Sequence, residues 1–230
     1  MKSFEREPLD RIAPLAEYGV ATVHEALGRT GLMATRLRPI FPGSAIVGNA
    51  VTVSLAPGDN TMFHVVVELC REGDVLVAAP TSPCTDGYFG ELLGSALHAR
   101  GVRGLIIDAG CRDVAQLKDL PFPVWSRAVS AQGTVKETLG DINRPLVCAE
   151  QLVHPGDLIV ADDDGVMVVP KARLGEALAA SLSRVQKEDA NRKRFLSGEV
   201  GLDVYGMRDR LAAKGLKYYE SADDLEAVRA

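Results

Sequence analysis

Two glycine-flanked turns hold the densest group of residues that could perform chemistry. In the first turn, Gly90 is followed by Glu91, Leu92 and Leu93, which open a predicted helix. The first backbone N–H groups of a helix have no carbonyl partner within it, so they are suited to binding a carboxylate. Glycine at position 90 would let a ligand come close to the chain. The first turn therefore predicts a substrate-binding site for an acidic small molecule.

The second turn places an arginine and an aspartate at the end of a predicted strand. Arg112 and Asp113 follow the apolar strand of residues 104–109, and a helix is predicted to begin near Asp113. Ligands of open α/β sheets usually bind at the carboxyl ends of the strands. The guanidinium of Arg112 could form paired hydrogen bonds with a substrate carboxylate. We therefore expect Arg112 and Asp113, together with Glu91, to be catalytic.

The two acids of these turns also suggest a metal. Taken singly, Glu91 and Asp113 could simply complement helix dipoles, and Arg112 could be an ordinary surface cation. Taken together, they supply two carboxylates for a hard cation and one guanidinium for a substrate. Mg²⁺ favours sites with few protein oxygens and several waters, and carboxylate and water ligands suit Mn²⁺ as well. The sequence therefore predicts Mg²⁺ or Mn²⁺ as the cofactor.

Other groups that often do chemistry show weaker patterns. The four histidines share no metal-ligand spacing, and three of them fall in helix-like segments, where a packed imidazole is the default. The four cysteines form no Cys-x-x-Cys pair and are expected to be reduced cytosolic thiols. Residues 162–164 are three aspartates that we interpret as turn residues, because the remaining spacing of a calcium loop is missing. The histidines are His24, His64, His98 and His154, and the cysteines are Cys70, Cys84, Cys111 and Cys148.

The elements around the two turns alternate between strand and helix patterns. This alternation predicts a mixed α/β sheet core. Helices are expected at residues 11–28, 60–70, 91–100, from 113, and 171–196, with a short one in the tail of residues 201–220; strands are expected at 45–55, 74–79, 104–109 and 123–129, and as a hairpin at 154–170. For residues 60–70 a strand is the alternative, because β-branched valines cluster there.

The chain is expected to form a single domain with an extension. Residues 1–170 are predicted to be the α/β catalytic core. Residues 171–230 are predicted to be a C-terminal helix and tail, with too little apolar surface to fold alone. This segment must therefore pack on the core or on a neighbouring subunit.

Composition narrows the class of partner. The 230 residues are 47% hydrophobic and carry 26 basic and 31 acidic side chains, for a formal net charge of -5. No Lys/Arg-rich block is present, which argues against nucleic acid as a partner. No apolar run approaches the length needed to span a bilayer, and the N-terminus does not have the pattern of a signal peptide. We expect a cytoplasmic protein that does not act at a membrane.

The spacing of the acidic and basic residues resembles that of a known family. Glu91 is followed by twenty residues and then by Arg112-Asp113. An acidic residue at this distance from Arg-Asp is typical of the class II pyruvate aldolases that act on 4-hydroxy-4-methyl-2-oxoglutarate and 4-carboxy-4-hydroxy-2-oxoadipate. The likeness extends from GDVLVAAP to GCRD, through the hairpin GDLIVADDDGVMVVP and into the tail GLDVYGMRDRLAAKGLKY.

The resemblance implies a fold and an assembly. The fold would be an α/β/β/α sandwich of swivelling-domain type, like that of the regulator of ribonuclease activity A group, with a C-terminal helical extension. Assembly as homotrimers or homohexamers is implied as well. Each subunit would bind a small 2-oxo acid.

The resemblance also implies roles for particular residues. Backbone amides of the loop Gly90–Leu93 would bind the pyruvyl group, Arg112 would contact the substrate, and Asp113 would ligate the metal. Glu91 stands where aspartate is commoner in the family, and would reach the metal through water. Glu188 is the candidate for an acid that a neighbouring subunit's C-terminal helix contributes.

The activity implied is retro-aldol cleavage to pyruvate plus oxaloacetate, or to pyruvate alone, in aromatic-acid catabolism such as protocatechuate and gallate breakdown. The base would be a water activated by the metal, and the same electron sink would serve a secondary oxaloacetate decarboxylation. A lysine Schiff base is less favoured, because no lysine lies between Lys2 and Lys118 and later ones, such as Lys136 and Lys171, fall in polar stretches. The alternative function is a non-catalytic regulatory binding protein of the regulator of ribonuclease activity A type.

Overall fold

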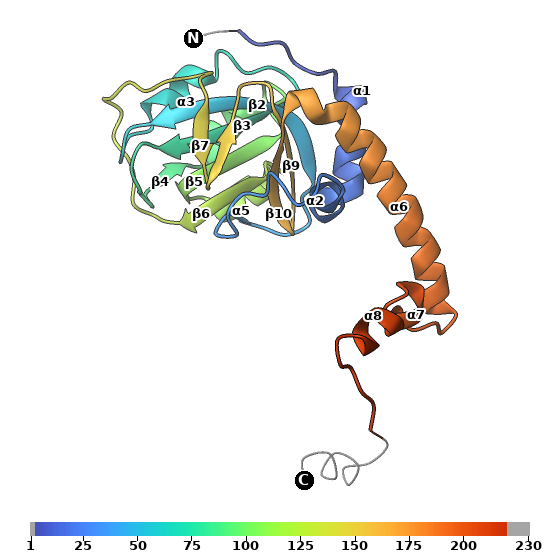
Figure 1. Ribbon diagram of the computed structural model, residues 1–230. Helices are drawn as coiled ribbons and strands as arrows, with labels where there is room; N and C mark the ends of the chain where they lie inside the picture. The colour runs from blue at the N-terminus through green and yellow to red at the C-terminus, as the bar shows by residue number, and fades with distance from the viewer. Residues whose placement is uncertain (1–2, 220–230) are drawn as a thin grey trace. The chain divides into compact units, whose positions relative to one another are not determined.

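The computed structural model describes residues 3–219, which divide into two compact units after Arg184 (Figure 1). The first unit contains the whole sheet and the first five helices. The second begins at Val185 and contains the end of the long helix α6 and two short helices. Both catalytic turns predicted from the sequence belong to the first unit.

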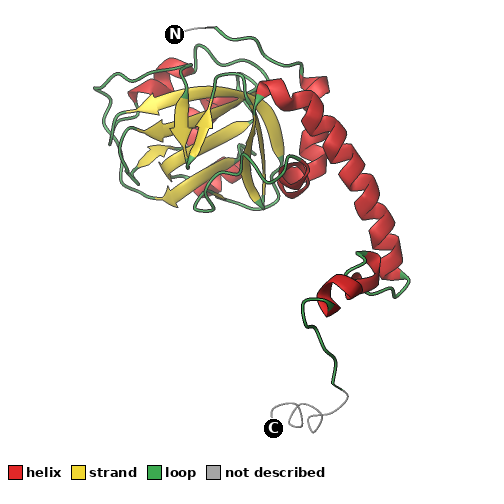
Figure 2. Ribbon diagram, in the orientation of Figure 1, coloured by secondary structure: helices red, strands yellow, loops and turns green. Residues whose placement is uncertain are grey.

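Most strands of the first unit join one strongly curved, nearly closed sheet (Figure 2). Its order is β1-β6-β5-β3-β2-β9-β10, and β4 pairs with β5 outside this path. The central strands β2, β3, β5 and β6 run parallel, whereas β1, β9 and β10 pair antiparallel. A small second sheet is formed by β7 and β8. The strands are β1 Arg38–Pro39, β2 Ile46–Leu55, β3 Asp74–Pro80, β4 Gly87–Phe89, β5 Gly104–Cys111, β6 Val124–Val129, β7 Leu146–Cys148, β8 Gln151–Val153, β9 Leu158–Asp162 and β10 Gly165–Val169.

The helices are short apart from α2 and α6. A 3-10 turn at Lys171–Arg173 precedes α6, which crosses from the first unit into the second. Between residues 3 and 219, no helix is long and apolar enough to cross a membrane. The helices are α1 Leu9–Ile12, α2 Pro14–Ala26, α3 Thr61–Val66, α4 Glu91–His98, α5 Val114–Asp119, α6 Leu174–Leu196, α7 Gly201–Val204 and α8 Arg208–Ala212.

Alternation along the parallel strands builds a core on each face of the sheet. Because successive strand residues point to opposite faces, Leu76 and Ala78 of β3 pack with α3, α4 and α5. Val75 and Val77 pack on the other face, where the β7–β8 hairpin and Trp125 cover them. Both faces are therefore buried, which explains the nearly continuous apolar sequence of these strands.

A third cluster attaches the N-terminal helices to the antiparallel edge. Val20 and Val23 of α2 pack with Val160 of β9 and Met167 of β10, all of them buried. The helix expected at 11–28 is divided into α1 and α2, and α2 is kinked at Gly19, whose φ of 79° is not helical. The apolar periodicity continues across the break, so the sequence pattern did not reveal it.

The mixed α/β prediction is confirmed, and so are the strands expected at 74–79, 104–109 and 123–129. Two differences concern short strands. Residues 80–90, where no strand was expected, contain β4, and residues 130–153, where none was expected either, contain the β7–β8 hairpin. Each of these strands has three residues, too few to show a period of two.

Leu76→Ala is expected to lower the free energy of unfolding by about 2–5 kcal/mol, because it leaves a cavity in the core. Leu76 is 0% exposed, whereas Leu139, the matched control, is 78% exposed. Leu139→Ala should stay within about 0.5 kcal/mol of the wild type. Urea unfolding followed by circular dichroism measures both. Equal destabilisation by the two variants would contradict the placement of Leu76 in the core.

Candidate functional site

The two predicted turns lie side by side because β4 and β5 are parallel neighbours. β4 runs into Gly90 and α4, and β5 runs into Arg112, Asp113 and α5. Phe89, the last residue of β4, lies opposite Cys111, the last residue of β5. The N–H of Arg112 donates to the carbonyl of Phe89 at 2.8 Å. Both turns therefore leave the sheet at the same edge.

Gly90 permits a close approach of the two turns. The N–H of Glu91 donates to Oδ2 of Asp113 at 3.1 Å. A Cβ at position 90 would overlap Oδ2 of Asp113 and would lie 3.2 Å from Cγ of Arg112. Any side chain at position 90 would therefore push the aspartate and the arginine away from α4.

Asp113 adopts an unusual backbone conformation. It is the N-cap residue of α5, with φ 57° and ψ 41°, in the left-handed region, and its side chain does not cap that helix. Left-handed backbone is uncommon outside glycine, and aspartate is one of the residues that tolerate it. Its carboxylate instead faces α4 and the side chain of Arg112, whose Nε lies 3.8 Å from Oδ2. Both side chains keep solvent access, at 49% for Arg112 and 38% for Asp113.

A pocket of about 110 Å³ brings most of the predicted residues together. Gly90, Leu92, Leu93, Arg112 and Asp113 all line it. The N–H groups of Leu92 and Leu93 belong to the first turn of α4, so the helix itself offers them no carbonyl. A guanidinium and unpaired amides around one small cavity are groups that could bind a carboxylate.

Two predicted residues lie outside the lining of this pocket. Glu91 stands at its edge on the first turn of α4, where its Oε1 accepts a hydrogen bond from Oγ of Ser95 at 2.7 Å. Glu188 is on α6 in the second unit, and the role predicted for it would be in the site of a neighbouring copy of the chain. The metal-binding roles of Glu91 and Glu188 stay predictions.

The structure adds four residues to the pocket that the sequence did not assign to it. They are Asn60, His64, Tyr88 and Lys136. His64, for which packing within a helix was expected, lies on α3 and faces the pocket. Lys136 comes from a segment without helix or strand. The sequence carried no signal for this group, because its members come from three separate parts of the chain.

Asn60 has an acceptor without a partner. Its side chain is buried, and Nδ2 donates to the carbonyl of Tyr88 at 2.9 Å. This bond orients the amide, so that Oδ1 is the buried atom that finds no hydrogen-bond partner among residues 3–219. An unpaired buried acceptor is costly, so a ligand hydroxyl that donates to Oδ1 would be favoured.

Tyr88 has a structural role in the wall of this pocket. Its hydroxyl accepts from the N–H of Gly58 at 2.6 Å and donates to the carbonyl of Ala56 at 3.2 Å. Burial raises the pKa of Tyr88 well above its usual range, so the phenol stays protonated. Tyr88 therefore holds the chain ahead of α3 against β4.

The donor set around Asp113 suits a hard divalent cation. Oδ1 of Asp113 accepts no hydrogen bond from residues 3–219, whereas Oδ2 accepts one from Glu91. Within the described chain, no three His, Cys, Asp or Glu side chains gather as a metal cluster. A cation here would therefore have one or two carboxylates and several waters, which is the coordination that Mg²⁺ favours.

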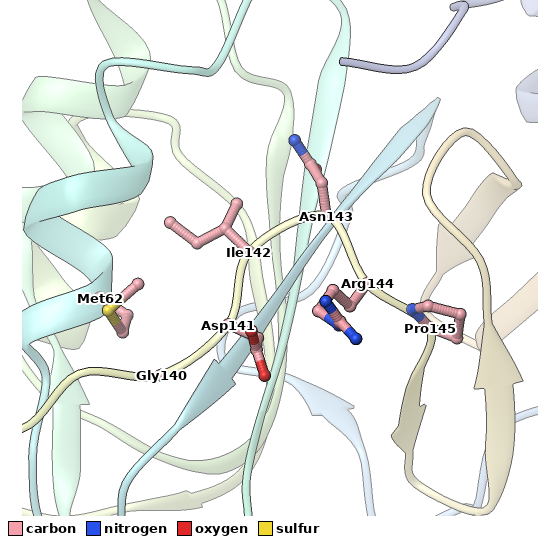
Figure 3. Close-up of a pocket in the computed structure, with 7 residues that line it drawn as sticks. All are labelled: Met62, Gly140, Asp141, Ile142, Asn143, Arg144 and Pro145. Atoms are coloured by element: carbon pink, nitrogen blue, oxygen red, sulfur yellow. The ribbon is translucent and has the colours of Figure 1, made fainter. Parts of the chain in front are cut away.

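A larger pocket elsewhere lacks this chemistry. It measures about 340 Å³, and Figure 3 shows Met62 of α3 facing the segment 140–145 that forms most of its wall. Its charged side chains, Asp141 and Arg144, are exposed. The pocket that contains Arg112 and Asp113 is therefore the candidate site.

Comparison with known proteins identifies the family. The pattern of the RraA-like family, described as Aldolase/RraA, matches residues 20–168, a segment that contains both turns and all the pocket residues. The chain therefore belongs to the RraA-like family.

Individual relatives agree with this assignment. A Halalkalibacterium halodurans protein named "Putative 4-hydroxy-4-methyl-2-oxoglutarate aldolase" is 32% identical over 193 residues, 84% of this chain and 91% of that protein. The 4-hydroxy-4-methyl-2-oxoglutarate aldolase of Thermus thermophilus is 25% identical over 135 residues, 59% of this chain and 82% of that protein. These names support an aldolase.

A solved structure confirms the predicted fold type. Streptomyces coelicolor RraAS2, described as an unusual member of the RNase ES inhibitor RraA protein family, matches with a TM-score of 0.73 and 26% identity. The match covers 83% of this chain and 99% of that one.

Of the four cysteines, only Cys84 is expected to react quickly with Ellman's reagent in the native protein at pH 8. Burial raises the pKa of the Cys70 and Cys148 thiols to about 12 and also raises the pKa of Cys111, so little reactive thiolate is present. Cys84 is half-buried. All four should react in guanidinium chloride. Rapid labelling of Cys111 in a Cys84→Ser variant would show that the chain next to Arg112 is open to solvent.

Proposed function

We propose that this protein is a divalent-metal-dependent aldolase that releases pyruvate from 4-hydroxy-4-methyl-2-oxoglutarate, 4-carboxy-4-hydroxy-2-oxoadipate or both. Secondary oxaloacetate decarboxylation and a place in aromatic-acid breakdown belong to the same proposal. The observation that carries it is the shared pocket of Arg112, Asp113 and the first-turn amides of α4. The names of the relatives support it independently.

The pyruvyl half of the substrate would bind at the two turns. Its carboxylate would accept hydrogen bonds from the amides of Leu92 and Leu93 and from the guanidinium of Arg112. Cleavage breaks the C3–C4 bond and leaves its electron pair on the pyruvyl fragment as an enolate, while the C4 hydroxyl would give its proton to a water molecule in the pocket and become the carbonyl of the other product. Arg112 would stabilise that negative charge, which is greater in the transition state than in the bound substrate.

Asp113, with Glu91 acting through water, would hold Mg²⁺ or Mn²⁺ beside the 2-oxo group. When bound, the cation supplies Lewis-acid polarisation of that carbonyl. The hydrogen bond from Glu91 N–H to Oδ2 of Asp113 keeps the carboxylate at the N-terminus of α4. The left-handed backbone of Asp113 is part of the same arrangement, because it directs the side chain away from its own helix.

The other half of the substrate would meet the residues that the sequence did not assign to the site. Its C4 hydroxyl would donate to the unpaired Oδ1 of Asn60. The carboxylate on C4, which both substrates carry, would pair with Lys136, and His64 lies on the same wall. Two cations in the pocket, Arg112 and Lys136, thus match the two carboxylates that the substrates share.

Assembly is part of the proposal as well. A homotrimer or homohexamer would allow Glu188 of one copy to approach the site of the next. The large apolar side chain of Leu92, 81% exposed at the edge of the pocket, would then be covered by a neighbouring copy.

Arg112→Lys is expected to reduce kcat/KM for pyruvate release at least 100-fold, because an ammonium cannot reproduce the forked contact with a carboxylate. Asp113→Asn should abolish the response to added Mg²⁺. A lactate dehydrogenase coupled assay measures pyruvate from 4-hydroxy-4-methyl-2-oxoglutarate, with protein first stripped by a chelator.

Arg103→Lys is the matched control, since Arg103 is exposed and lies outside the pocket lining. It should retain wild-type activity. If the wild type releases no pyruvate from either substrate or from oxaloacetate with any divalent metal, the aldolase proposal fails. A regulatory binding protein, as the description of RraAS2 suggests, would then be favoured.

Treatment with borohydride in the presence of pyruvate is expected to leave the enzyme active. Lys136 lines the pocket, so a Schiff base on this side chain is the natural rival mechanism. A lysine nucleophile is normally desolvated in an apolar site, whereas Lys136 is exposed. Mass spectrometry checks the outcome. A reduced pyruvyl adduct on Lys136 would replace the metal route with the imine route.

A further inference from the structure

The carboxylate of Asp59 is buried just ahead of α3 and accepts four hydrogen bonds. Asp59 is 2% exposed. Oδ1 accepts from the N–H and the hydroxyl of Thr61, at 2.8 and 2.6 Å. Oδ2 accepts from the N–H groups of Glu137 and Thr138, both at 2.7 Å. One carboxylate thus joins two segments that are almost eighty residues apart.

Each of these segments carries part of the pocket wall. Asn60 directly follows Asp59, and Lys136 directly precedes Glu137. Backbone hydrogen bonds join the same segments, from Asn60 N–H to the Val135 carbonyl at 3.0 Å and from Val135 N–H to the carbonyl of Gly58 at 2.9 Å. The hydrogen bonds that Asp59 accepts extend this pairing to the residues after Lys136, where no backbone hydrogen bond joins the two segments.

The chain around Lys136 has few other restraints. Residues 130–145 contain no helix or strand, and only two isolated bridges, at Val135 and Ile142. The lysine side chain is exposed and long, so the position of its ammonium depends on how its backbone is held. The two backbone N–H groups that donate to Oδ2 of Asp59 are the first two after Lys136.

The carboxylate of Asp59 is held as an anion by these donors. Burial on its own would raise the pKa of Asp59, but the hydrogen bonds from Thr61, Glu137 and Thr138 outweigh burial and hold that pKa well below its usual range. Among residues 3–219, no cationic side chain forms an ion pair with it. Its stabilisation therefore comes from the two segments that it joins.

We propose that Asp59 is a positioning residue that holds Lys136 where it can bind the distal carboxylate of a dicarboxylic 2-oxo acid. The proposal rests on the proposed function for its substrate class. Asp59 does not line the pocket, and acts through the segment that carries Lys136. Replacing Asp59 should therefore weaken the binding of ligands that have a second carboxylate, and should leave the binding of pyruvate, which has only one carboxylate, unchanged.

Asp59→Asn is the test variant, because it keeps the shape of the side chain but leaves one acceptor oxygen for donors that two oxygens meet in the wild type, so that Thr61 and the two amides cannot all keep their hydrogen bonds. We expect KM for 4-hydroxy-4-methyl-2-oxoglutarate to rise about tenfold and kcat to change less than about threefold. Inhibition by 2-oxoglutarate, which keeps the distal carboxylate but lacks the C4 hydroxyl, should weaken about tenfold. Inhibition by pyruvate should stay within about twofold. Equal weakening for pyruvate and 2-oxoglutarate would overturn the proposal.

A double-mutant cycle with Lys136→Met shows whether Asp59 acts through the lysine. If it does, the double variant should bind 2-oxoglutarate no more weakly than Lys136→Met alone. Additive losses would mean that the two residues act independently, and would also overturn the proposal.

Asp157→Asn is the matched control for loss of a buried carboxylate. Asp157 is 7% exposed and accepts hydrogen bonds from the N–H groups of His154 and Lys171, at 2.8 and 3.0 Å, outside the pocket lining. The Asp157→Asn variant should have a lower Tm than the wild type and an unchanged affinity for 2-oxoglutarate. If it weakens 2-oxoglutarate as much as Asp59→Asn does, general loosening explains both variants and the positioning role is refuted.

Calorimetric titration of the Mg²⁺-loaded wild type with pyruvate and 2-oxoglutarate separates the two proposals. Binding without pyruvate release would refute the aldolase alone, and the Asp59→Asn selectivity would still support positioning. Pyruvate release without that selectivity would refute positioning alone. Absence of both binding and release would refute both.

Discussion

The close approach of two parallel strand ends underlies the whole candidate site. A Cβ at Gly110 of β5 would overlap the carbonyl oxygen of Thr85, just before β4, and a Cβ at Gly87 of β4 would overlap that of Ser130, just after β6. Gly90 continues the same constraint one residue beyond β4. Gly90 and Gly110 thus remove side chains that would separate the two turns, and Gly87 lets the segment after β6 pack against β4. The N–H of Glu91 at the start of α4 reaches the carboxylate of Asp113 after β5 as a result.

This arrangement shows why part of the site could be predicted from the sequence. Gly90 and Glu91 are local signals of a helix start, and Arg112-Asp113 follow an apolar run long enough to be recognised as a strand. Adjacent parallel strands have their carboxyl ends at the same edge of the sheet, so the turns that follow two paired strands lie close together. The sequence did not indicate the left-handed backbone of Asp113, because both helical and left-handed residues occur before a helix.

The rest of the site depends on contacts that no local pattern encodes. Asn60 and Lys136 meet because Asp59 and the short pairing around Val135 join their segments. His64 lies on a six-residue helix with buried neighbours on both sides, so its sequence context is that of a packed residue. The β7–β8 hairpin was missed for a related reason, since its strands are three residues long. Long-range pairing, rather than propensity, decides these features.

The division of the pocket between separate parts of the chain has a consequence for how such enzymes diversify. The turns after β4 and β5 belong to the rigid sheet, whereas Lys136 stands on the irregular connection between β6 and β7. Insertions and substitutions are tolerated far better in such connections than in a parallel sheet. A lineage could therefore change the ligand groups that this part of the pocket accepts by remodelling this connection alone, while inheriting the turns after β4 and β5 unchanged.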